Sequence, residues 1–424
     1  MSKRVVITGL GVAAPNGVGI EAFSHSIKNG ISGIRHDAQL QELQFSCQIT
    51  GQPQISEEIK AQYFTELELR GFNSTGILYG VIAGMEAWNN AGLSIEINDE
   101  PDWDNGAIFG AGTSGIDKFR ESIYKIDELQ VRRLGSTVVA QTMNSGISAY
   151  LGGKLGLGNQ VTTNSSACTT GTEAILMAYD RIQAGKAKRI LAGSTSDSGP
   201  YIWAGFDALR VCSSKYNDNP EAGSRPMSAT AAGFVPGSGA GALVIEDLES
   251  ALERGVTIYA EILGGDVNSG GQRGNGSMTA PNSTAVQRCI TNAIHNSGIS
   301  PDAVDAINGH LTATTKDSLE IENWTKALGR KGTEFPYINS LKSMTGHCLS
   351  AAGSIESIAT VLQLYEGFIF GNTNCDDLHP DITALIDSSK VSLKTINSNP
   401  AIIAKASFGF GDVNACIIFK KFEK

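Results

Sequence analysis

Two amphipathic segments of equal length occupy corresponding places in this chain. Residues 171–185 and 353–367 each begin and end with glycine and carry apolar residues at helical spacing. The first follows a turn that contains Cys168, and the second follows a turn that contains His347. Equal helices alone are weak evidence, because amphipathic patterns recur by chance. With their matching turns, they predict a duplicated fold in which each half places a functional turn before a buried helix.

Predicted strands alternate with helices along both halves. This alternation favours an α/β layered architecture with central sheets covered by helices. A short helix at 248–254 marks the expected boundary, which divides the chain into halves 1–256 and 257–424 without a flexible linker. A site built from both halves would lie between them. The expected strands are 5–9, 106–110, 161–164, 189–193 and 242–246, then 258–267, 306–308, 337–340, 401–406 and 415–420.

Cys168 stands in an Ala-Cys-Thr-Thr-Gly turn between a short extended run and the helix that starts near Thr172. At a helix N-terminus, unpaired N–H groups and the positive end of the dipole favour a thiolate. We therefore expect the pKa of this thiol to be lowered and its sulfur to be nucleophilic. The alternative is a buried structural cysteine, since free cysteine is among the most buried residue types.

Two histidines stand in small, polar, Gly- and Thr-rich turns. His310 lies in Asn-Gly-His-Leu-Thr-Ala-Thr, and His347 lies in Lys-Ser-Met-Thr-Gly-His, which begins at Lys342. A cysteine with distant histidines is a pattern of nucleophilic catalysis, although sequence separation does not establish contact. For either histidine alone, a structural hydrogen-bonding role would be the better interpretation.

These motifs, together with Ser-Phe-Gly-Phe-Gly at 407–411, resemble the beta-ketoacyl-[acyl-carrier-protein] synthases of the thiolase superfamily, in particular the elongating enzymes of types I and II. The resemblance covers essentially the whole chain. It implies an α/β thiolase-like fold of two duplicated halves. It also implies a decarboxylative Claisen condensation of malonyl-carrier protein with an acyl group on Cys168, which extends the chain by two carbons in fatty acid biosynthesis.

The resemblance assigns roles to the motif residues. Cys168 carries the acyl group, while His310 and His347 donate hydrogen bonds to the enolate oxygen formed on decarboxylation. The backbone N–H groups of Cys168 and Phe410 form the oxyanion hole, and Lys342 tunes the electrostatics of the site. The enzyme itself binds no cofactor and no metal, because its substrates are carried on the phosphopantetheine of acyl carrier protein.

Further residues receive supporting roles from the same resemblance. The acyl pocket and its gate are expected at Ser114, Gly115, Phe206, Phe408, Phe410 and Asp412. Thr312 and Thr314 would bind the pantetheine arm, and Asp317 and Glu320 would support the site from one face of a helix. Arg132, Arg133, Arg210 and Lys215 would receive the acidic carrier protein.

Three positions depart from the family pattern. Leu311 and Ala313 stand where glycines or serine are usual, so the loop after His310 is expected to be stiffer or differently shaped. Asp412 replaces a second glycine after Phe410-Gly411 and removes backbone freedom from the gating loop. We expect its carboxylate to bond locally, to backbone N–H groups or to a polar neighbour across the loop, because an unpaired buried charge is costly.

Composition excludes several other classes of function. The net charge of −10 argues against nucleic acid as a partner, and the sequence contains no apolar run long enough for a membrane span. The seven cysteines, an odd number, fit a reducing compartment better than a disulfide framework. We expect a soluble, cytoplasmic protein that forms a homodimer, with a heterodimer possible.

Three other functions remain open from the sequence. The same chemistry could serve a specialised polyene or polyketide pathway. A non-condensing partner subunit that sets chain length is a different class, and Cys168 argues against it because such subunits typically lack the nucleophile. A cysteine hydrolase would discharge its acyl-enzyme to water instead of to malonyl-carrier protein.

Overall fold

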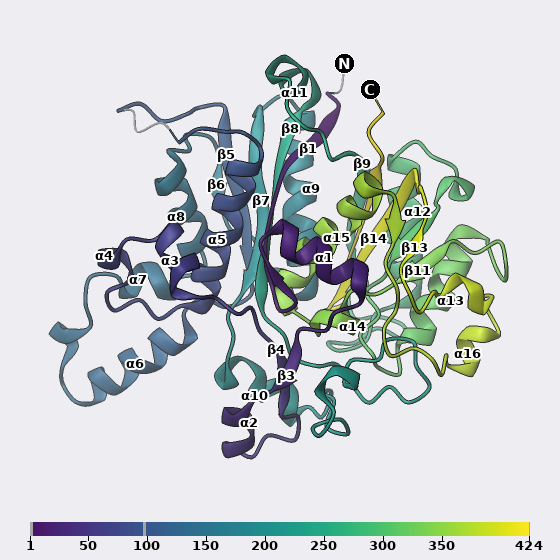
Figure 1. Cartoon of the computed structure of the whole chain (residues 1–424), viewed down its shortest axis with the longest axis horizontal. Helices are drawn as coiled ribbons and strands as arrows, with labels where there is room; N and C mark the ends of the chain where they lie inside the picture. Colours follow the sequence, from purple (N-terminus) through teal and green to yellow (C-terminus); the bar gives the residue numbers. More distant parts are fainter. Residues whose placement is uncertain (1–2, 96–98, 424) are drawn as a thin grey trace.

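The computed structural model describes residues 3–95 and 99–423. Its centre is one 11-stranded mixed sheet with the strand order β6-β5-β7-β8-β1-β9-β15-β14-β10-β11, and β2 pairs with β1 (Figure 1). The strands of this sheet are β1 Val5–Ala14, β2 Gly17–Val18, β5 Asn105–Ala111, β6 Val161–Thr162, β7 Arg189–Ser196, β8 Gly239–Asp247, β9 Ala260–Ser269, β10 Ala306–Asn308, β11 Tyr337–Asn339, β14 Ile402–Gly409 and β15 Val413–Lys420. Two small antiparallel sheets pair β3 Ile34–His36 with β4 Ile49–Gly51, and β12 Phe368–Ile369 with β13 Ile396–Asn397.

Helices cover both faces of this sheet (Figure 1). They are α1 Ile20–Asn29, α2 Ala38–Glu42, α3 Glu57–Tyr63, α4 Glu66–Leu69, α5 Thr75–Asn90, α6 Ile116–Asp127, α7 Val138–Thr142, α8 Gly146–Leu155, α9 Thr170–Gln183, α10 Pro200–Ala208, α11 Leu248–Arg254, α12 Ser283–Asn296, α13 Asp317–Leu328, α14 Lys342–Thr345, α15 Ala352–Glu366 and α16 Pro380–Thr383. Short 3-10 turns include η1 Val131–Arg133, η2 Ala167–Thr169 and η5 Leu349–Ala351. Within the described ranges, no helix is both long and apolar enough to cross a membrane.

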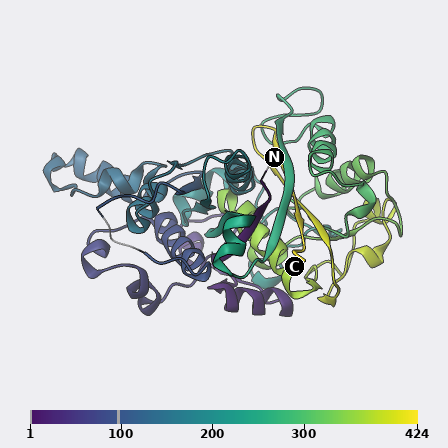
Figure 2. The same ribbon diagram turned by 90° about the horizontal axis from the view of Figure 1, so that it is seen from above.

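The sheet consists of two halves with the same pattern of pairing. From the outer edge inward, β6-β5-β7 and β11-β10-β14 are parallel, whereas β7-β8-β1 and β14-β15-β9 are antiparallel. The halves meet where β1 pairs with β9, so the predicted central sheets form one continuous sheet. Figure 2 shows the N-terminal half on one side and the green-to-yellow C-terminal half on the other. The predicted α/β fold of two duplicated halves is confirmed.

The repeated helices α9 and α15 lie against each other in the middle of the molecule. A Cβ atom added to Gly171 would lie 2.4 Å from the backbone nitrogen of Ser354, and one added to Gly353 would lie 2.6 Å from that of Thr172. The glycine that opens each segment is thus required for close packing. The turns before the helices also match, since η2 and η5 begin with Ala167 and Leu349 at φ values of 49° and 50°.

Each predicted strand is present, with ends that differ by a few residues. The hydrophobic core follows the duplication, with one cluster over each half and a third around α9 and α15. Both termini lie near the junction of the halves in Figures 1 and 2. The first turns of α9 and α15 meet at this junction, and the functional turns that precede them lie there.

Candidate active site

Cys168 lies in the 3-10 turn η2, directly before α9, as predicted. The preceding residue, Ala167, has a left-handed backbone conformation, which few non-glycine residues adopt and which often marks a functional turn. The thiol is half-buried at a cavity of about 280 Å³. The residues that line this cavity include Cys168, Phe206, Val211, Phe234, Thr279, Pro281, Val286, His310, Thr312, Thr314, His347, Leu349, Phe408 and Phe410.

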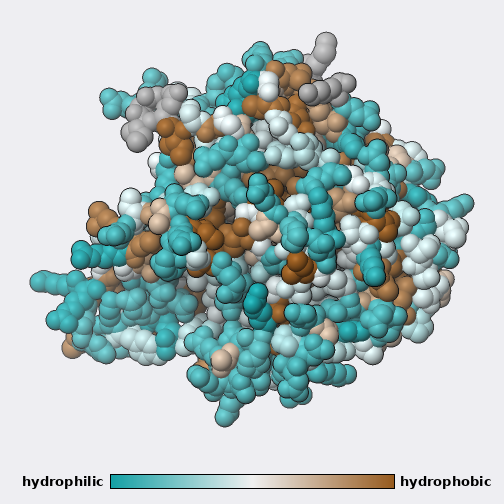
Figure 3. All heavy atoms as spheres, viewed as in Figure 1, coloured by the Kyte–Doolittle hydropathy of each residue, from teal (hydrophilic) through white to brown (hydrophobic). Residues whose placement is uncertain are grey.

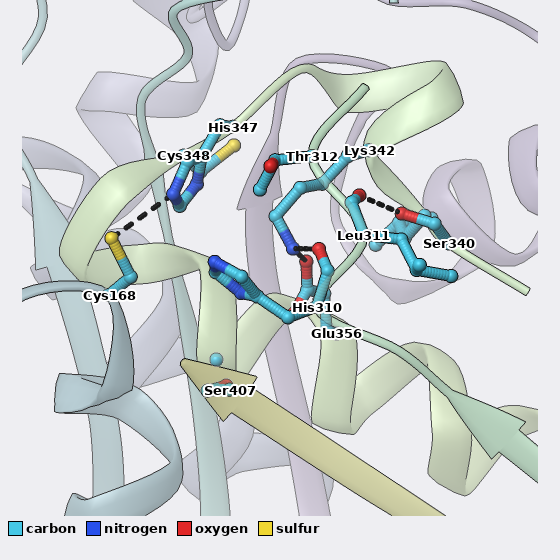
Figure 4. Close-up of polar contacts among 12 residues, drawn as sticks. Cys168, His310, Leu311, Thr312, Ser340, Lys342, His347, Cys348, Glu356 and Ser407 are labelled. Carbon is cyan, nitrogen blue, oxygen red and sulfur yellow. Dashed lines mark hydrogen bonds and ion pairs between the residues drawn. The ribbon is translucent and has the colours of Figure 1, made fainter. Parts of the chain in front are cut away.

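Both predicted histidines converge on this cysteine (Figure 4). His347 Nε2 lies 3.1 Å from Cys168 Sγ, and the backbone N–H of Leu349 donates to His347 Nδ1 at 3.2 Å. Because Nδ1 accepts, the neutral ring carries its proton on Nε2 and donates toward the sulfur. The His310 and His347 rings are 5.4 Å apart, and the ligand atoms of all three residues lie within 4.8 Å of one another.

The expected lowering of the Cys168 pKa is wrong. Burial raises the pKa of this thiol to about 11, although Lys342 and the backbone N–H groups of Phe410 and Cys168 act in the opposite direction. Desolvation outweighs the favourable groups because the cavity around the sulfur is largely apolar. The free enzyme therefore holds Cys168 mainly as a thiol at neutral pH.

Lys342 is fully buried behind His310 instead of lining the cavity. Its Nζ donates to the His310 backbone oxygen at 2.6 Å and to Glu356 Oε1 (Figure 4). The second oxygen of Glu356 lies 2.9 Å from Nζ of Lys405, another fully buried lysine. Sequence reasoning missed Glu356 and Lys405. Their signal was a charge inside the mostly apolar α15, whose other charge is its last residue, Glu366, and a lone charge within the mostly apolar β14.

Both histidines are held in the neutral form. Burial is the main cause that lowers the pKa of each ring well below its ordinary value, and the charges of Lys342 and Lys405 add to it. A neutral imidazole can donate a hydrogen bond without carrying a charge into the cavity. This agrees with the predicted role of His310 and His347 as donors.

Asp317 and Glu320 of α13 hold the loop that carries His310. The backbone N–H groups of His310 and Leu311 donate to the two Glu320 oxygens at 2.7 and 2.8 Å. Asp317 accepts from the N–H groups of Thr312 and Ala313 at 2.9 and 3.1 Å. Both carboxyl groups are buried, so they serve the loop and not a solvated helical face.

The loop departures fit this arrangement. The Leu311 side chain is fully buried in the C-terminal core, and Ala313 has a φ of 61°, a left-handed conformation that strains a residue with a Cβ atom. Asp317 stabilises that conformation through its bond to the Ala313 N–H. Burial also raises the pKa of Glu320 to about 7.

Aromatic residues form one wall of the cavity. The Phe206 ring packs 5.9 Å from Phe410 and 5.6 Å from Phe234, centroid to centroid, and Phe408 packs 6.1 Å from His310. Thr312 and Thr314 also line the cavity. Ser114, which precedes α6, and Gly115, its N-cap, are not among the described residues that line it.

Asp412 lies in the turn between β14 and β15 in a left-handed conformation, with a φ of 62°. Its side chain is buried, and its two oxygens accept from the backbone N–H groups of Asn282 at 2.8 Å and Gln272 at 3.0 Å. The predicted local bonding of this carboxylate is confirmed. It ties the Phe410 loop to residues 270–282, which supply Thr279 and Pro281 to the cavity wall.

The four predicted docking residues are exposed. Arg132 and Arg133 lie in η1, and Arg210 and Lys215 follow α10. Arg210 directly precedes Val211, which lines the cavity. The face in Figure 3 is largely hydrophilic, with hydrophobic residues in separate patches.

Cys168, His310 and His347 are close enough to contact one soft metal ion. The two ammonium groups of Lys342 and Lys405, whose charge reaches both histidines, oppose a cation at this point. The charges around the three residues therefore disfavour a bound metal ion.

Two family models match the chain in order. The Beta-ketoacyl synthase, N-terminal domain matches residues 2–251, and the Beta-ketoacyl synthase, C-terminal domain matches residues 259–376. The 3-oxoacyl-[acyl-carrier-protein] synthase 2 of Vibrio harveyi is 33% identical over 426 residues, which are 99% of each chain. The 3-oxoacyl-[acyl-carrier-protein] synthase 1 of Escherichia coli K12 is 32% identical over 430 residues, 99% of this chain and 100% of its own length.

Solved structures agree with these matches. A beta-ketoacyl synthase from Burkholderia phymatum superimposes with a TM-score of 0.89 at 27% identity, over 99% of this chain and 100% of its own. A type II polyketide ketosynthase in complex with its acyl-carrier protein gives 0.87 at 27% identity over the whole of both chains. The fold is therefore the thiolase-like fold of ketosynthases, and the protein is an acyltransferase. The chain belongs to the beta-ketoacyl synthase family.

Proposed function

We propose that this protein is a 3-oxoacyl-[acyl-carrier-protein] synthase of fatty acid biosynthesis. It joins an acyl group held on Cys168 to the two carbons left when malonyl-carrier protein loses carbon dioxide. The observation that carries this proposal is the meeting of Cys168, His310 and His347 within 4.8 Å at the wall of a mainly apolar cavity. The boundary between residues 256 and 257 divides the half that carries the cysteine from the half that carries the histidines.

The first step is transfer of the acyl group to Cys168. Sγ attacks the thioester carbonyl of the acyl-carrier protein, and the carrier thiol leaves with the proton that the cysteine gives up. The backbone N–H groups of Cys168 and Phe410 act on the sulfur, which supports their proposed role as donors to the carbonyl oxygen during attack. The Nε2–H of His347 stabilises the developing thiolate.

The second step makes the carbon nucleophile. When the malonyl thioester loses carbon dioxide, negative charge moves onto its thioester oxygen as the enolate forms. His310 and His347 hold that oxygen as neutral donors, because burial and the two lysines keep both rings uncharged. The enolate carbon then attacks the acyl carbonyl, the bond to Sγ breaks, and a 3-oxoacyl chain two carbons longer remains on the carrier.

The remaining assignments concern the substrate arm and its carrier. Thr312 and Thr314 line the cavity and would hydrogen-bond the phosphopantetheine. Arg132, Arg133, Arg210 and Lys215 would pair with the acidic carrier protein. A ketosynthase solved with its acyl-carrier protein, a structural neighbour of this chain, supports that partner.

We further propose a cytoplasmic homodimer. All seven cysteines are free, which suits a reducing compartment. Exposed apolar residues gather on α6 and the segments after it: Phe119, Ile123, Ile126, Leu129, Val131 and Val139. Helix α6 projects from one end of the molecule (Figures 1 and 2). An apolar surface of this kind suits contact with a second copy of the chain. Light scattering after gel filtration measures the mass of the assembly and so tests the homodimer.

The test of the proposed reaction is a defined reconstitution. Wild-type protein with acyl- and malonyl-carrier protein should form 3-oxoacyl-carrier protein. In Cys168→Ala the rate of product formation should be at least about 1,000-fold lower. Product from the alanine variant at a near wild-type rate would contradict the mechanism.

A specialised polyketide or polyene pathway is the second candidate. It is favoured by structural neighbours described as a type II polyketide ketosynthase and an ishigamide ketosynthase/chain length factor, the latter at 25% identity. Saturated acyl-carrier proteins of graded length, tested against polyenoyl carriers, separate the two. Preferential acylation by polyenoyl chains would assign the specialised pathway.

A further inference from the structure

Lys405 is a fully buried lysine in the middle of β14, the central strand of the C-terminal half of the sheet. Its ammonium group makes two hydrogen bonds and one ion pair. Nζ donates to the backbone oxygen of Ala406 and to Ser407 Oγ at 3.0 Å, and it pairs with Glu356 Oε2 at 2.9 Å. A buried ammonium is costly unless it is paired and hydrogen-bonded, and this one has an ion pair with Glu356 and two hydrogen bonds. The steps above give it no part in the reaction.

Lys405 connects to the decarboxylation side of the site through Glu356. This carboxylate lies between two ammonium groups, with Lys342 on Oε1 and Lys405 on Oε2. Lys342 in turn holds the backbone oxygen of His310 at 2.6 Å. Lys405 therefore fixes the second oxygen of the carboxylate whose first oxygen holds Lys342 in place beside His310.

A second connection runs to the cysteine side. Lys405 donates to Ser407, whose hydroxyl lies 2.9 Å from Thr172 Oγ1. Thr172 stands in the first turn of α9, one turn beyond Cys168. The strand that carries Lys405 also continues directly into Phe408 and Phe410 of the cavity wall. One side chain thus contacts groups that fix both reacting sides.

The charges around this cluster do not cancel. One Glu356 carboxylate faces the two ammonium groups of Lys342 and Lys405, which leaves one positive charge in excess. The next acid that acts on Lys405 is Glu320, and burial raises the pKa of that carboxyl to about 7. Asp317 lies beyond Glu320, and four backbone N–H groups donate hydrogen bonds to its carboxyl group. A fixed positive charge near the cavity favours negative charge that develops there.

We propose that Lys405 is a positioning residue of the reaction: it holds Glu356 and Ser407 in place and supplies the excess positive charge that favours the enolate. This inference rests on the proposed condensation. It assigns a function to a second lysine, because the sequence analysis expected only Lys342 to tune the electrostatics of the site.

Lys405→Met tests the proposal with malonyl-carrier protein, by release of carbon dioxide. We expect kcat for decarboxylation to fall about 10- to 100-fold with little change in KM, less than the loss from a direct donor. Lys154→Met is the matched control, because Lys154 also pairs with a carboxylate, Glu68, but lies outside the cavity lining. It should retain the wild-type kcat.

Chemical rescue distinguishes charge from packing. Lys405→Ala leaves space for a small cation, so ammonium chloride should restore its kcat in a saturable way, whereas tetramethylammonium chloride should not. Equal decarboxylation by wild type and Lys405→Met would overturn the proposal. So would a loss that ammonium cannot restore, or failure of both variants to fold even in ammonium, since Lys405 would then be structural. If the wild-type protein released no carbon dioxide from malonyl-carrier protein, the result would instead contradict the proposed function.

Discussion

At the scale of single residues, Cys168 experiences two opposing effects. Lys342 and the backbone N–H groups of Phe410 and Cys168 favour the thiolate. The sequence predicted that the start of α9 would lower the pKa. Burial against an apolar cavity is larger and raises the pKa to about 11. The sulfur is therefore a protected thiol that becomes a nucleophile when the thioester and the Nε2–H of His347 are in place.

The histidine variants test the division of labour in the site. His310→Ala and His347→Ala should each lower malonyl decarboxylation by about 100- to 1,000-fold, because each removes a donor to the enolate oxygen. At least one variant should still transfer an acyl group to Cys168. Decarboxylation is followed as released carbon dioxide, and acylation as protein mass. Loss of acylation in both variants with intact decarboxylation would reverse the assignment.

Glu320 gives a pH-dependent prediction for stability. Burial raises its pKa from 4.5 to about 7, so the folded protein binds this proton more tightly than the unfolded chain. Its stabilising contribution is full below pH 4.5 and is lost as the pH rises to about 7. Relative to Glu320→Gln, the free energy of unfolding of the wild type should fall by about 3 kcal/mol across this window. Denaturant unfolding at several pH values measures it, and a rising difference would refute the assigned direction.

At the scale of elements, the loops after β9 and β14 act as a pair. The backbone N–H of Gly270 donates to the backbone oxygen of Asp412 at 2.8 Å, and the Asp412 carboxylate accepts from the N–H groups of Gln272 and Asn282. Asp412 therefore joins the loop of Phe410 to residues 270–282. Movement of either loop requires the other to move or these bonds to break.

Asp412→Gly should release this connection. Glycine adopts the left-handed φ without strain but loses both carboxylate bonds, so hydrogen exchange of the Gln272 and Asn282 amides should rise about tenfold or more. Acylation rate or acyl-length selectivity should change more than the unfolding midpoint. Asp412→Asn is the control, because it keeps one acceptor oxygen. Unchanged acylation and selectivity with a markedly lower midpoint would show that Asp412 is only structural.

The elements were predictable because their signals are local. The alternation of strand and helix candidates indicated the layered fold, and the paired glycines located α9 and α15. Strand β6 is an exception: residues 161–164 were expected, but only Val161–Thr162 pair, since the chain then turns toward η2. The left-handed turn at Ala313 was not predicted, because its Asp317 partner becomes adjacent only when α13 forms.

At the scale of the whole molecule, duplication explains where the site lies. The turns before α9 and α15 meet because Gly171 and Gly353 allow the two helices to touch. The sequence could predict that the site lies between halves, because the motifs divide between them. It could not predict the Glu356 and Lys405 pair, since that contact depends on how α15 packs on β14. Nor could it predict that Ser114 and Gly115 lie apart from the cavity lining.

The central claim is that Cys168 carries the acyl group that malonyl-carrier protein then extends. The direct measurement is the intact mass of the protein after acyl-carrier protein is added, and again after malonyl-carrier protein. We predict one acyl adduct on wild type and none on Cys168→Ala, and the adduct should disappear only with malonyl-carrier protein as 3-oxoacyl-carrier protein forms. An adduct that remains on Cys168→Ala, or one that water discharges as fast as malonyl-carrier protein does, would contradict the account.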